Sequence, residues 1–111
     1  MDVKAELKNC SVSAQKMRLV LDLVRGTMAE EAVSRLRFTN KAAAKPVSKL
    51  ISSAIANAEN NFGMNREKLY IYQIAADEAP TRKWRRFGAR GRFKPILRRS
   101  SHVKVVLREK A

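Results

Sequence analysis

The 111-residue chain has one cysteine, one histidine and no long apolar run. The single Cys10 excludes an intrachain disulfide, and with His102 it gives too few ligands for a usual zinc site. No stretch approaches the roughly 18 to 20 apolar residues of a membrane span, and the first ten residues lack the apolar run of a signal peptide. We therefore expect no disulfide, metal, cofactor or membrane segment, and a place in the cytoplasm, an organelle not being excluded.

Catalytic side chains are equally scarce. One histidine, one cysteine and no cluster of carboxylates leave no evident nucleophile, base or metal site, so we do not expect an enzyme. Asp77 and Glu78 form an acidic pair that we expect to hold nearby arginines or a backbone turn.

Acidic residues are absent from the 22 residues Pro80–Ser101, here called the arm. The arm carries seven arginines and two lysines at both odd and even positions, so an extended strand would have no apolar face to bury. Of the net charge of +14, the other 89 residues hold only +5. Such a segment is disordered alone or is held by an outside polyanion, most commonly a phosphate backbone. We expect a single domain of residues 1–111, with residues 1–79 and 102–111 as its globular body.

Hydrophobic periodicity predicts the elements of this body. Val3, Ala5 and Leu7 alternate with charged residues, which indicates a half-buried strand. An amphipathic helix follows, with Ser13 as its N-cap and Gly26 as its stop.

Two further helices are predicted. The first covers about residues 28–38, with Thr27 and Glu30 at the spacing of a capping box. The second is an apolar stripe over about residues 41–60, in which Pro46 indicates a later start or a mild bend.

A strand over residues 69–76, with Tyr70, Tyr72 and Ile74 on one face, matches an apolar run near the C-terminus. If the arm is a continuous hairpin whose tip lies between Ala89 and Arg90, apolar residues face one another. The predicted pairs are Tyr72 with Leu107, Ile74 with Val105 and Ala76 with Val103. A bulge would shift this register. We expect a ribbon of roughly 30 Å that is ordered only in a complex.

Six segments are informative together through their order and spacing: Ser13–Val20, Leu23–Gly26, Ser53–Glu59, Asp77–Pro80, Arg90–Arg92 and Ser101–His102. With them the chain resembles the family of bacterial large-subunit ribosomal proteins numbered twenty-two. The resemblance implies an α+β fold with three helices on a small antiparallel three-stranded sheet and a long protruding basic β-hairpin. It also implies a structural protein that binds 23S-type ribosomal RNA, aids subunit assembly by bridging RNA domains and lines the nascent-peptide exit tunnel.

The implied partners are 23S-type ribosomal RNA, neighbouring large-subunit proteins and the nascent polypeptide, without a membrane or a homo-oligomer. The tunnel-lining tip would be Phe87, Gly88, Ala89, Arg90, Gly91, Arg92 and Phe93. The RNA-embedded stem would hold Arg82, Lys83, Arg85, Arg86, Lys94, Arg98 and Arg99. The excess of arginine over lysine favours shaped RNA, because a guanidinium grips phosphate in two places and stacks on bases. The arm's three aromatic residues either stack on bases or pack across the ribbon.

The body offers further candidates for RNA binding, either as basic helix stripes or at a helix N-terminus. They are Ser13, Gln15, Lys16, Arg18, Arg25, Lys41, Lys45 and Lys49. The alternative is that these side chains form ordinary solvated helix faces.

Two other functions remain open. A DNA-bending architectural protein also uses a basic β-arm, although such proteins are generally dimers. An RNA-processing enzyme is disfavoured by the missing active-site residues.

Overall fold

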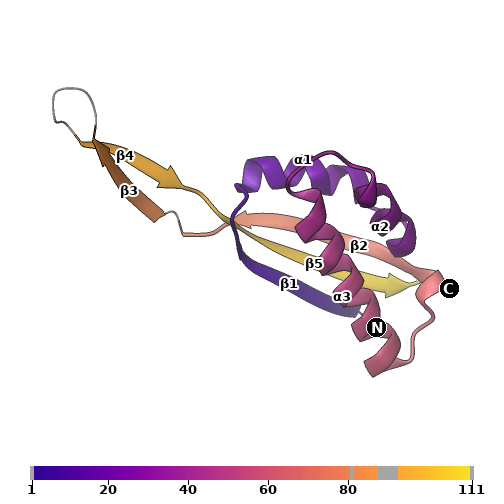
Figure 1. Ribbon diagram of the computed structural model, residues 1–111. Coiled ribbons are helices and arrows are strands. Elements are labelled where there is room, and N and C mark those ends of the chain that lie inside the picture. The colour runs from indigo at the N-terminus through magenta and orange to yellow at the C-terminus, as the bar shows by residue number, and fades with distance from the viewer. Residues whose placement is uncertain (1, 81, 88–92, 111) are drawn as a thin grey trace.

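The computed structural model describes residues 2–80, 82–87 and 93–110, and it describes residues 82–87 and 93–98 as backbone. The elements follow in the order β1 (Asp2–Cys10), α1 (Ala14–Val24), α2 (Ala29–Arg37), α3 (Ala44–Phe62), the 3₁₀ turn η1 (Arg66–Lys68), β2 (Leu69–Glu78), β3 (Arg82–Phe87), β4 (Phe93–Arg98) and β5 (Ser101–Glu109). The molecule is elongated, 64 × 25 × 18 Å, with β3 and β4 projecting from one end of the body (Figure 1). Its radius of gyration is 17.0 Å, against about 13 Å for a compact chain of this length.

The body is an antiparallel sheet in the order β1-β5-β2, with the three helices against one face (Figure 1). Strand residues alternate between buried and exposed positions, as a sheet covered on one face requires. α3 packs on β1 and β5, while α1 packs mainly on β2. The predicted α+β architecture of three helices on a three-stranded antiparallel sheet is confirmed.

The first helix, α1, forms where the pattern predicts it. The Ser13 hydroxyl accepts a hydrogen bond from the Lys16 backbone N–H at 3.4 Å, so the predicted N-cap is confirmed. Gly26 follows the helix with φ of 76°, a conformation that costs little without a Cβ atom. The buried stripe of α1 consists of Ala14, Met17, Val20, Leu21 and Val24.

The predicted capping box of α2 is wrong. The Thr27 hydroxyl donates to the Val24 carbonyl oxygen at 2.8 Å, back toward the end of α1, and Met28 occupies the N-cap position without a side-chain cap. A threonine hydroxyl competes for nearby carbonyls as readily as it caps, so the spacing of Thr27 and Glu30 alone did not decide its partner.

The third helix, α3, begins three residues later than the predicted position 41. Pro46 is therefore its third residue, where a backbone N–H would have no partner within the helix. The later start is confirmed as the accommodation of this proline. The helix ends at Gly63, whose φ is 61° and whose N–H donates to the Ala58 carbonyl oxygen.

The strand β2 contains a bulge between Ile71 and Gln73. Ile71 pairs with Leu107, so the predicted pairing of Tyr72 with Leu107 is wrong, whereas the pairs Ile74–Val105 and Ala76–Val103 are confirmed. The extra residue moves Tyr70 and Tyr72 off the buried face, where Leu69, Ile71, Ile74 and Ala76 lie. The prediction that both tyrosines share a face with Ile74 is therefore wrong.

The predicted continuous ribbon is interrupted where the arm leaves the body. β3 and β4 pair as a separate two-stranded sheet, from Arg82 opposite Arg98 to Phe87 opposite Phe93. The last pair of the body sheet is Glu78–Ser101, and the first pair of the arm is Arg82–Arg98. Between these two pairs, one strand advances by four residues and the other by three, which is a second one-residue shift in register. The expected tip between Ala89 and Arg90 lies outside the described residues.

Candidate nucleic-acid interface

The backbone register of the arm places positions of like charge opposite one another. Arg82 faces Arg98, and Arg86 faces Lys94, across the β3–β4 pair. Like charges directly opposite on neighbouring strands destabilise a sheet, and a two-stranded ribbon is marginal in water even without this repulsion. A bound polyanion would remove the repulsion, so the register itself favours an anionic partner. The predicted tip residues 88–92 lie outside the described residues.

Three predicted binding residues meet at the root of the arm. A pocket of about 360 Å³ lies between the N-terminus of α1 and the segments that enter and leave the arm. Its lining residues are Ser13, Ala14, Gln15, Glu78, Ala79, Arg99 and Ser100. Lys16 is exposed one residue further along α1. The first free N–H groups of α1 thus lie beside an arginine of the arm, an arrangement that suits a phosphate.

Hydrogen bonds tie this root to the body. The Ala79 N–H donates to the Ser100 carbonyl oxygen at 3.1 Å, which joins the two segments of the root. The fully buried Ser101 donates through its hydroxyl to the Val12 carbonyl oxygen at 2.8 Å. Between β1 and β5, the Asn9 N–H donates to Nδ1 of His102 at 3.0 Å. His102 is half-buried near the root, and this contact gives it a structural role.

The two arginines predicted on α1 contact the sheet. Arg18 donates to the Ala76 carbonyl oxygen at 3.0 Å, and Arg25 donates to the Ile74 carbonyl oxygen at 2.7 Å. Arg25 also lies 3.4 Å from Asp22. Both side chains therefore bind the outer edge of β2, a role that the helix-face pattern did not predict. Each guanidinium has five N–H donors, so these contacts leave donors for an outside phosphate.

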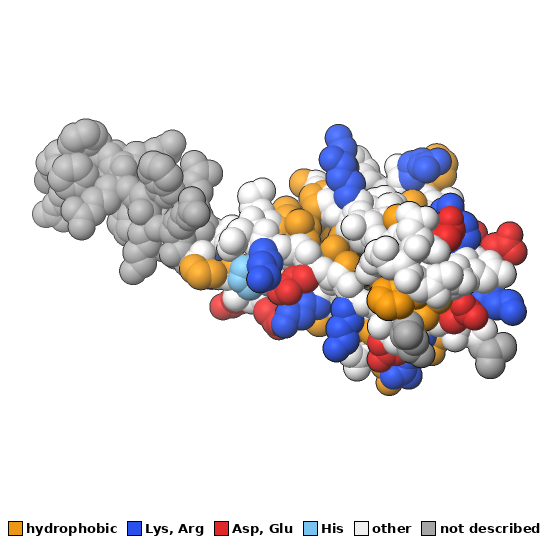
Figure 2. All heavy atoms as spheres, turned by 90° about the horizontal axis from the view of Figure 1, so that it is seen from below, with side chains coloured by type: hydrophobic (Ala, Val, Ile, Leu, Met, Phe, Trp, Pro, Cys, Tyr) orange, Lys and Arg blue, Asp and Glu red, His pale blue; other side chains and the backbone are white. Residues whose placement is uncertain are grey.

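The three lysines predicted as one stripe do not all lie on α3. Lys41 precedes the helix, while Lys45 and Lys49 lie one turn apart on it, beside β1. The arginines of α1 lie at the edge of β2, so the candidates of the two helices sit at opposite edges of the sheet. Figure 2 likewise shows basic and acidic side chains interspersed over one side of the body.

An aromatic and charged cluster on the sheet was missed by the sequence analysis. The Arg108 guanidinium lies 3.4 Å from the centroid of the Tyr72 ring, and Tyr72 meets Tyr70 edge to face. Arg108 also pairs with Asp2. The hydrogen bond from Arg108, aided by its charge, lowers the pKa of the Asp2 carboxyl from its ordinary value of 3.8, and that contact in turn raises the pKa of Arg108. The bulge puts Tyr72 on the face opposite that of Ile74, so a period-two pattern that grouped the two residues gave no signal of this cluster.

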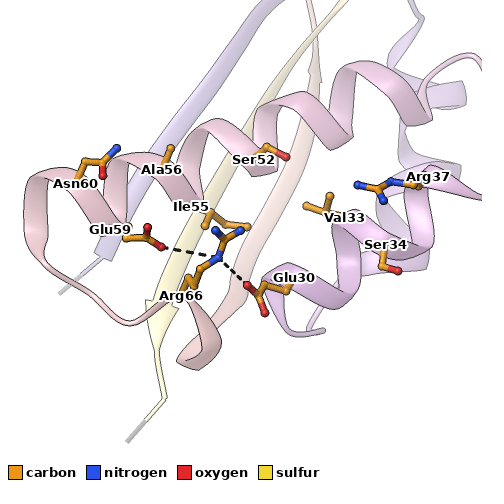
Figure 3. Close-up of a pocket in the computed structure, with 10 residues that line it drawn as sticks. All are labelled: Glu30, Val33, Ser34, Arg37, Ser52, Ile55, Ala56, Glu59, Asn60 and Arg66. Carbon is orange, nitrogen blue, oxygen red and sulfur yellow. Dashed lines mark ion pairs between the residues drawn. The ribbon is translucent and has the colours of Figure 1, made fainter.

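A pocket of about 310 Å³ between α2 and α3 contains none of the predicted binding residues (Figure 3). Arg66 reaches across it, with Nε 2.6 Å from a carboxylate oxygen of Glu30 and 3.8 Å from one of Glu59. These contacts join η1 to both helices. The pocket is therefore explained as a structural junction.

Metal and membrane sites were also sought in the described part of the chain. Among residues 2–80, 82–87 and 93–110, no group of three or more His, Cys, Asp or Glu side chains is placed to hold a metal ion. None of the described helices is long and apolar enough to cross a membrane.

Comparison with known proteins gives matches over nearly the whole chain. A family model described as ribosomal protein L22p/L17e matches residues 5–108. The large ribosomal subunit protein uL22 of Dehalococcoides mccartyi (strain CBDB1) is 56% identical over 107 residues, which cover 96% of this chain and 98% of that protein. The protein of the same name from Thermoanaerobacter sp. (strain X514) is 46% identical over 110 residues, 99% of each chain. That of Pediococcus pentosaceus is 45% identical over 107 residues, 96% of this chain and 91% of the relative.

Proposed function

Because this chain belongs to the ribosomal protein L22p/L17e family, we propose that it binds 23S-type ribosomal RNA through its arm and lines the nascent-peptide exit tunnel with the arm's tip. Membership makes it a structural component of the large ribosomal subunit and not an enzyme. Its partners are accordingly ribosomal RNA and neighbouring ribosomal proteins. The proposal adds the RNA-binding surface, the tunnel contact with the nascent polypeptide and a role in assembly.

The observation that carries the proposal is the β3–β4 register. It sets Arg82 opposite Arg98 and Arg86 opposite Lys94 in a segment without a single acidic residue. A protein-only environment leaves this repulsion unrelieved, whereas phosphates on both sides of the ribbon relieve it and supply bidentate partners for the arginines. The stem residues Lys83, Arg85 and Arg99 contribute further positive side chains for phosphate binding.

The body adds a second contact at the root of the arm. Ser13, Gln15 and Lys16 present the N-terminus of α1 beside Arg99, so a phosphate held there fixes the angle at which the arm enters RNA. Arg18 and Arg25 each donate to a carbonyl oxygen of β2, so they contact RNA only through their remaining N–H groups. A body and an arm that grip different RNA segments would bridge RNA domains, which is the proposed contribution to assembly.

Chemical footprinting of large-subunit RNA tests this function. The full chain is compared with a variant in which residues 83–96 are replaced by a short glycine–serine turn. The body sheet keeps all of its pairs in this variant, because β3 and β4 form a separate ladder. We expect the variant to retain the protections made by the body and to lose those near the tunnel.

Two controls make the footprints interpretable. Circular dichroism and urea unfolding of the variant establish that its body is folded before RNA is added. A second variant, with Arg85, Arg86 and Arg98 changed to glutamine, keeps the length of the arm and removes three charges. Identical protections from all three proteins would refute the role proposed for the arm.

A further inference from the structure

The two outer edges of the body sheet differ. The edge of β2 is closed by groups from the preceding segments. The Ile71 N–H donates to the Thr27 carbonyl oxygen at 2.9 Å, and Met28 forms an isolated bridge with Tyr70. Further along, the arginines of α1 occupy the outward carbonyl oxygens of Ile74 and Ala76. This edge has no room for another strand.

The opposite edge, that of β1, is open. β1 pairs only with β5, in regular register from Asp2 to Leu7, and is irregular between Leu7 and Cys10. No other strand in the described part of the chain lies beside it (Figure 1). Every second residue of an edge strand directs its N–H and C=O groups outward, where they serve as a template for another extended chain. Natural proteins usually block such an edge, as this one blocks β2.

A groove follows the open edge. It has a volume of about 650 Å³ and lies between β1 and the first half of α3. Its lining residues are Glu6, Leu7, Ala42, Lys45, Pro46, Lys49, Leu50 and Ser53. Leu7 and Pro46 are half-buried and Leu50 is buried, so they form an apolar floor, while Lys45 and Lys49 are exposed at the rim.

The charges around this edge are mainly positive. Lys45 and Lys49 lie on α3, and Lys4 and Lys8 are exposed on the face of β1 that the helices do not cover. Glu6 is the one carboxylate among the groove-lining residues. An occupant with acidic side chains is therefore favoured over a basic one.

We infer that the β1 edge and this groove bind an extended segment of another protein, one that alternates apolar residues with Asp or Glu, as a fourth strand of the sheet. Its backbone completes the hydrogen bonds of β1. Its apolar side chains lie on the floor of Leu7, Pro46 and Leu50. Its carboxylates point to the opposite face of the sheet, where they meet Lys4 and Lys8. This inference rests on family membership only for the expectation of protein neighbours, and it stands or falls separately from RNA binding by the arm.

Ribosomal RNA is the competing occupant, because Lys45 and Lys49 are also phosphate-binding candidates. A phosphate backbone would satisfy these ammonium groups. It would leave the outward N–H and C=O groups of β1 without a ladder and the apolar floor open to water. Only another polypeptide in extended form matches all three features.

A peptide titration of the full chain, followed by the NMR signals of its backbone amides, tests the inference. The probe is a synthetic nonapeptide, acetyl-EVTVEVTVE-amide, which carries the required alternation. We expect saturable shifts confined to β1 and the first half of α3, with a dissociation constant of about 0.1 to 1 mM. The outward-facing β1 amides should also exchange more slowly with solvent once the peptide is bound.

Charge-reversal variants separate the groove from general attraction to the body. The double variant Lys4→Glu and Lys8→Glu should weaken peptide binding about tenfold, because these lysines lie on the sheet face to which the peptide's carboxylates point. Both side chains are exposed, so the fold should persist. The matched control is Lys104→Glu, on the exposed face of β5, which should change the affinity by less than about twofold.

A third comparison isolates the backbone ladder. A peptide that is N-methylated at all of its central residues keeps its charge but has no N–H donor on either edge, and it should not bind. The inference is overturned if no shifts appear at several millimolar peptide, or if the N-methylated peptide binds as well as the parent. It is also overturned if the peptide is inert while a short RNA hairpin shifts the same β1 and α3 amides.

Discussion

Arg25 illustrates how a helix-surface arginine stabilises the edge of a sheet. Its guanidinium donates to the Ile74 carbonyl oxygen at 2.7 Å, although half of the side chain is exposed. Changing Arg25 to methionine should lower the free energy of unfolding by about 1 kcal/mol, which is less than the roughly 1.5 to 3 kcal/mol of a buried charged hydrogen bond because the side chain is half exposed. Urea unfolding measures the difference. The control is Arg37→Met on α2, which should change stability by less than about 0.5 kcal/mol, and equal effects of the two changes would contradict the assigned role.

Asp2 gives the molecule a predictable dependence on pH. The hydrogen bond from Arg108 lowers the pKa of Asp2 in the folded chain below its unfolded value. The pair therefore stabilises the fold above the unfolded pKa of 3.8, and this stabilisation is lost as the pH falls through the lower folded value.

Asp2→Asn should accordingly be less stable than the parent at pH 7, and the two proteins should converge at low pH. Urea midpoints at pH 7, 5 and 2.5 follow the convergence. The control is Glu6→Gln, which removes an exposed carboxylate from the same strand and leaves the Asp2–Arg108 pair in place. A constant difference between Asp2→Asn and the parent at every pH would rule out the ion pair as its cause.

At the scale of single residues, the sequence identified the candidates but not their partners. Ser13 was predicted correctly as an N-cap because a serine directly before an apolar stripe of helical spacing has its partner, a backbone N–H of the first turn, close by in the sequence. Arg18 and Arg25 looked like an RNA-facing stripe because their carbonyl partners lie about 50 residues further along the chain. A contact of that separation leaves no local pattern.

At the scale of elements, the end of α3 depends on Gly63. A Cβ built on this glycine has no atom within 4 Å, so its φ of 61° is the only obstacle to a side chain. Gly63→Ala should lower the free energy of unfolding by about 1 kcal/mol because the left-handed conformation crowds the Cβ atom. Gly63→Asn should cost less, since asparagine tolerates this conformation better. An alanine variant as stable as the parent would show that the helix ends elsewhere.

Strands were harder to predict than helices, for a physical reason. Helix stripes repeat every 3.6 residues, so α1 and α3 remained recognisable even where their first residues were misplaced. A strand repeats every two residues, so one extra residue reverses the faces of the side chains on one side of it relative to those on the other. The predicted register held for the pair Ile74–Val105, on the arm side of the bulge, and failed for Tyr72, which lies at the bulge.

At the scale of the whole molecule, charge is concentrated where the chain projects from its body. If about six to nine charges of the arm contact phosphates, RNA affinity should fall with salt with a log–log slope of about −5 to −8. Changing Arg85, Arg86 and Arg98 to glutamine should reduce this slope by about 2 to 3. Filter binding to a large-subunit RNA fragment between 50 and 300 mM KCl measures it, and Lys104→Gln is the control. A slope that the triple change leaves unaltered would place the contacts on the body.

The α+β architecture and the basic arm could be predicted because hydrophobic periodicity and charge are visible within short stretches of the sequence. The break between the two sheets did not. It lies just beyond the hydrogen bond from Ala79 to Ser100, which joins residues 21 positions apart and still follows the register of the body sheet.

The central claim is that the arginines of the arm are held by folded ribosomal RNA. The most direct measurement is a structure of the large ribosomal subunit containing this chain, at a resolution that shows guanidinium groups and phosphates. The account predicts that most of the basic residues from Arg82 to Arg99 lie within about 4 Å of RNA phosphates or stack on bases. An arm lying in open solvent, with those side chains away from any phosphate, would contradict it.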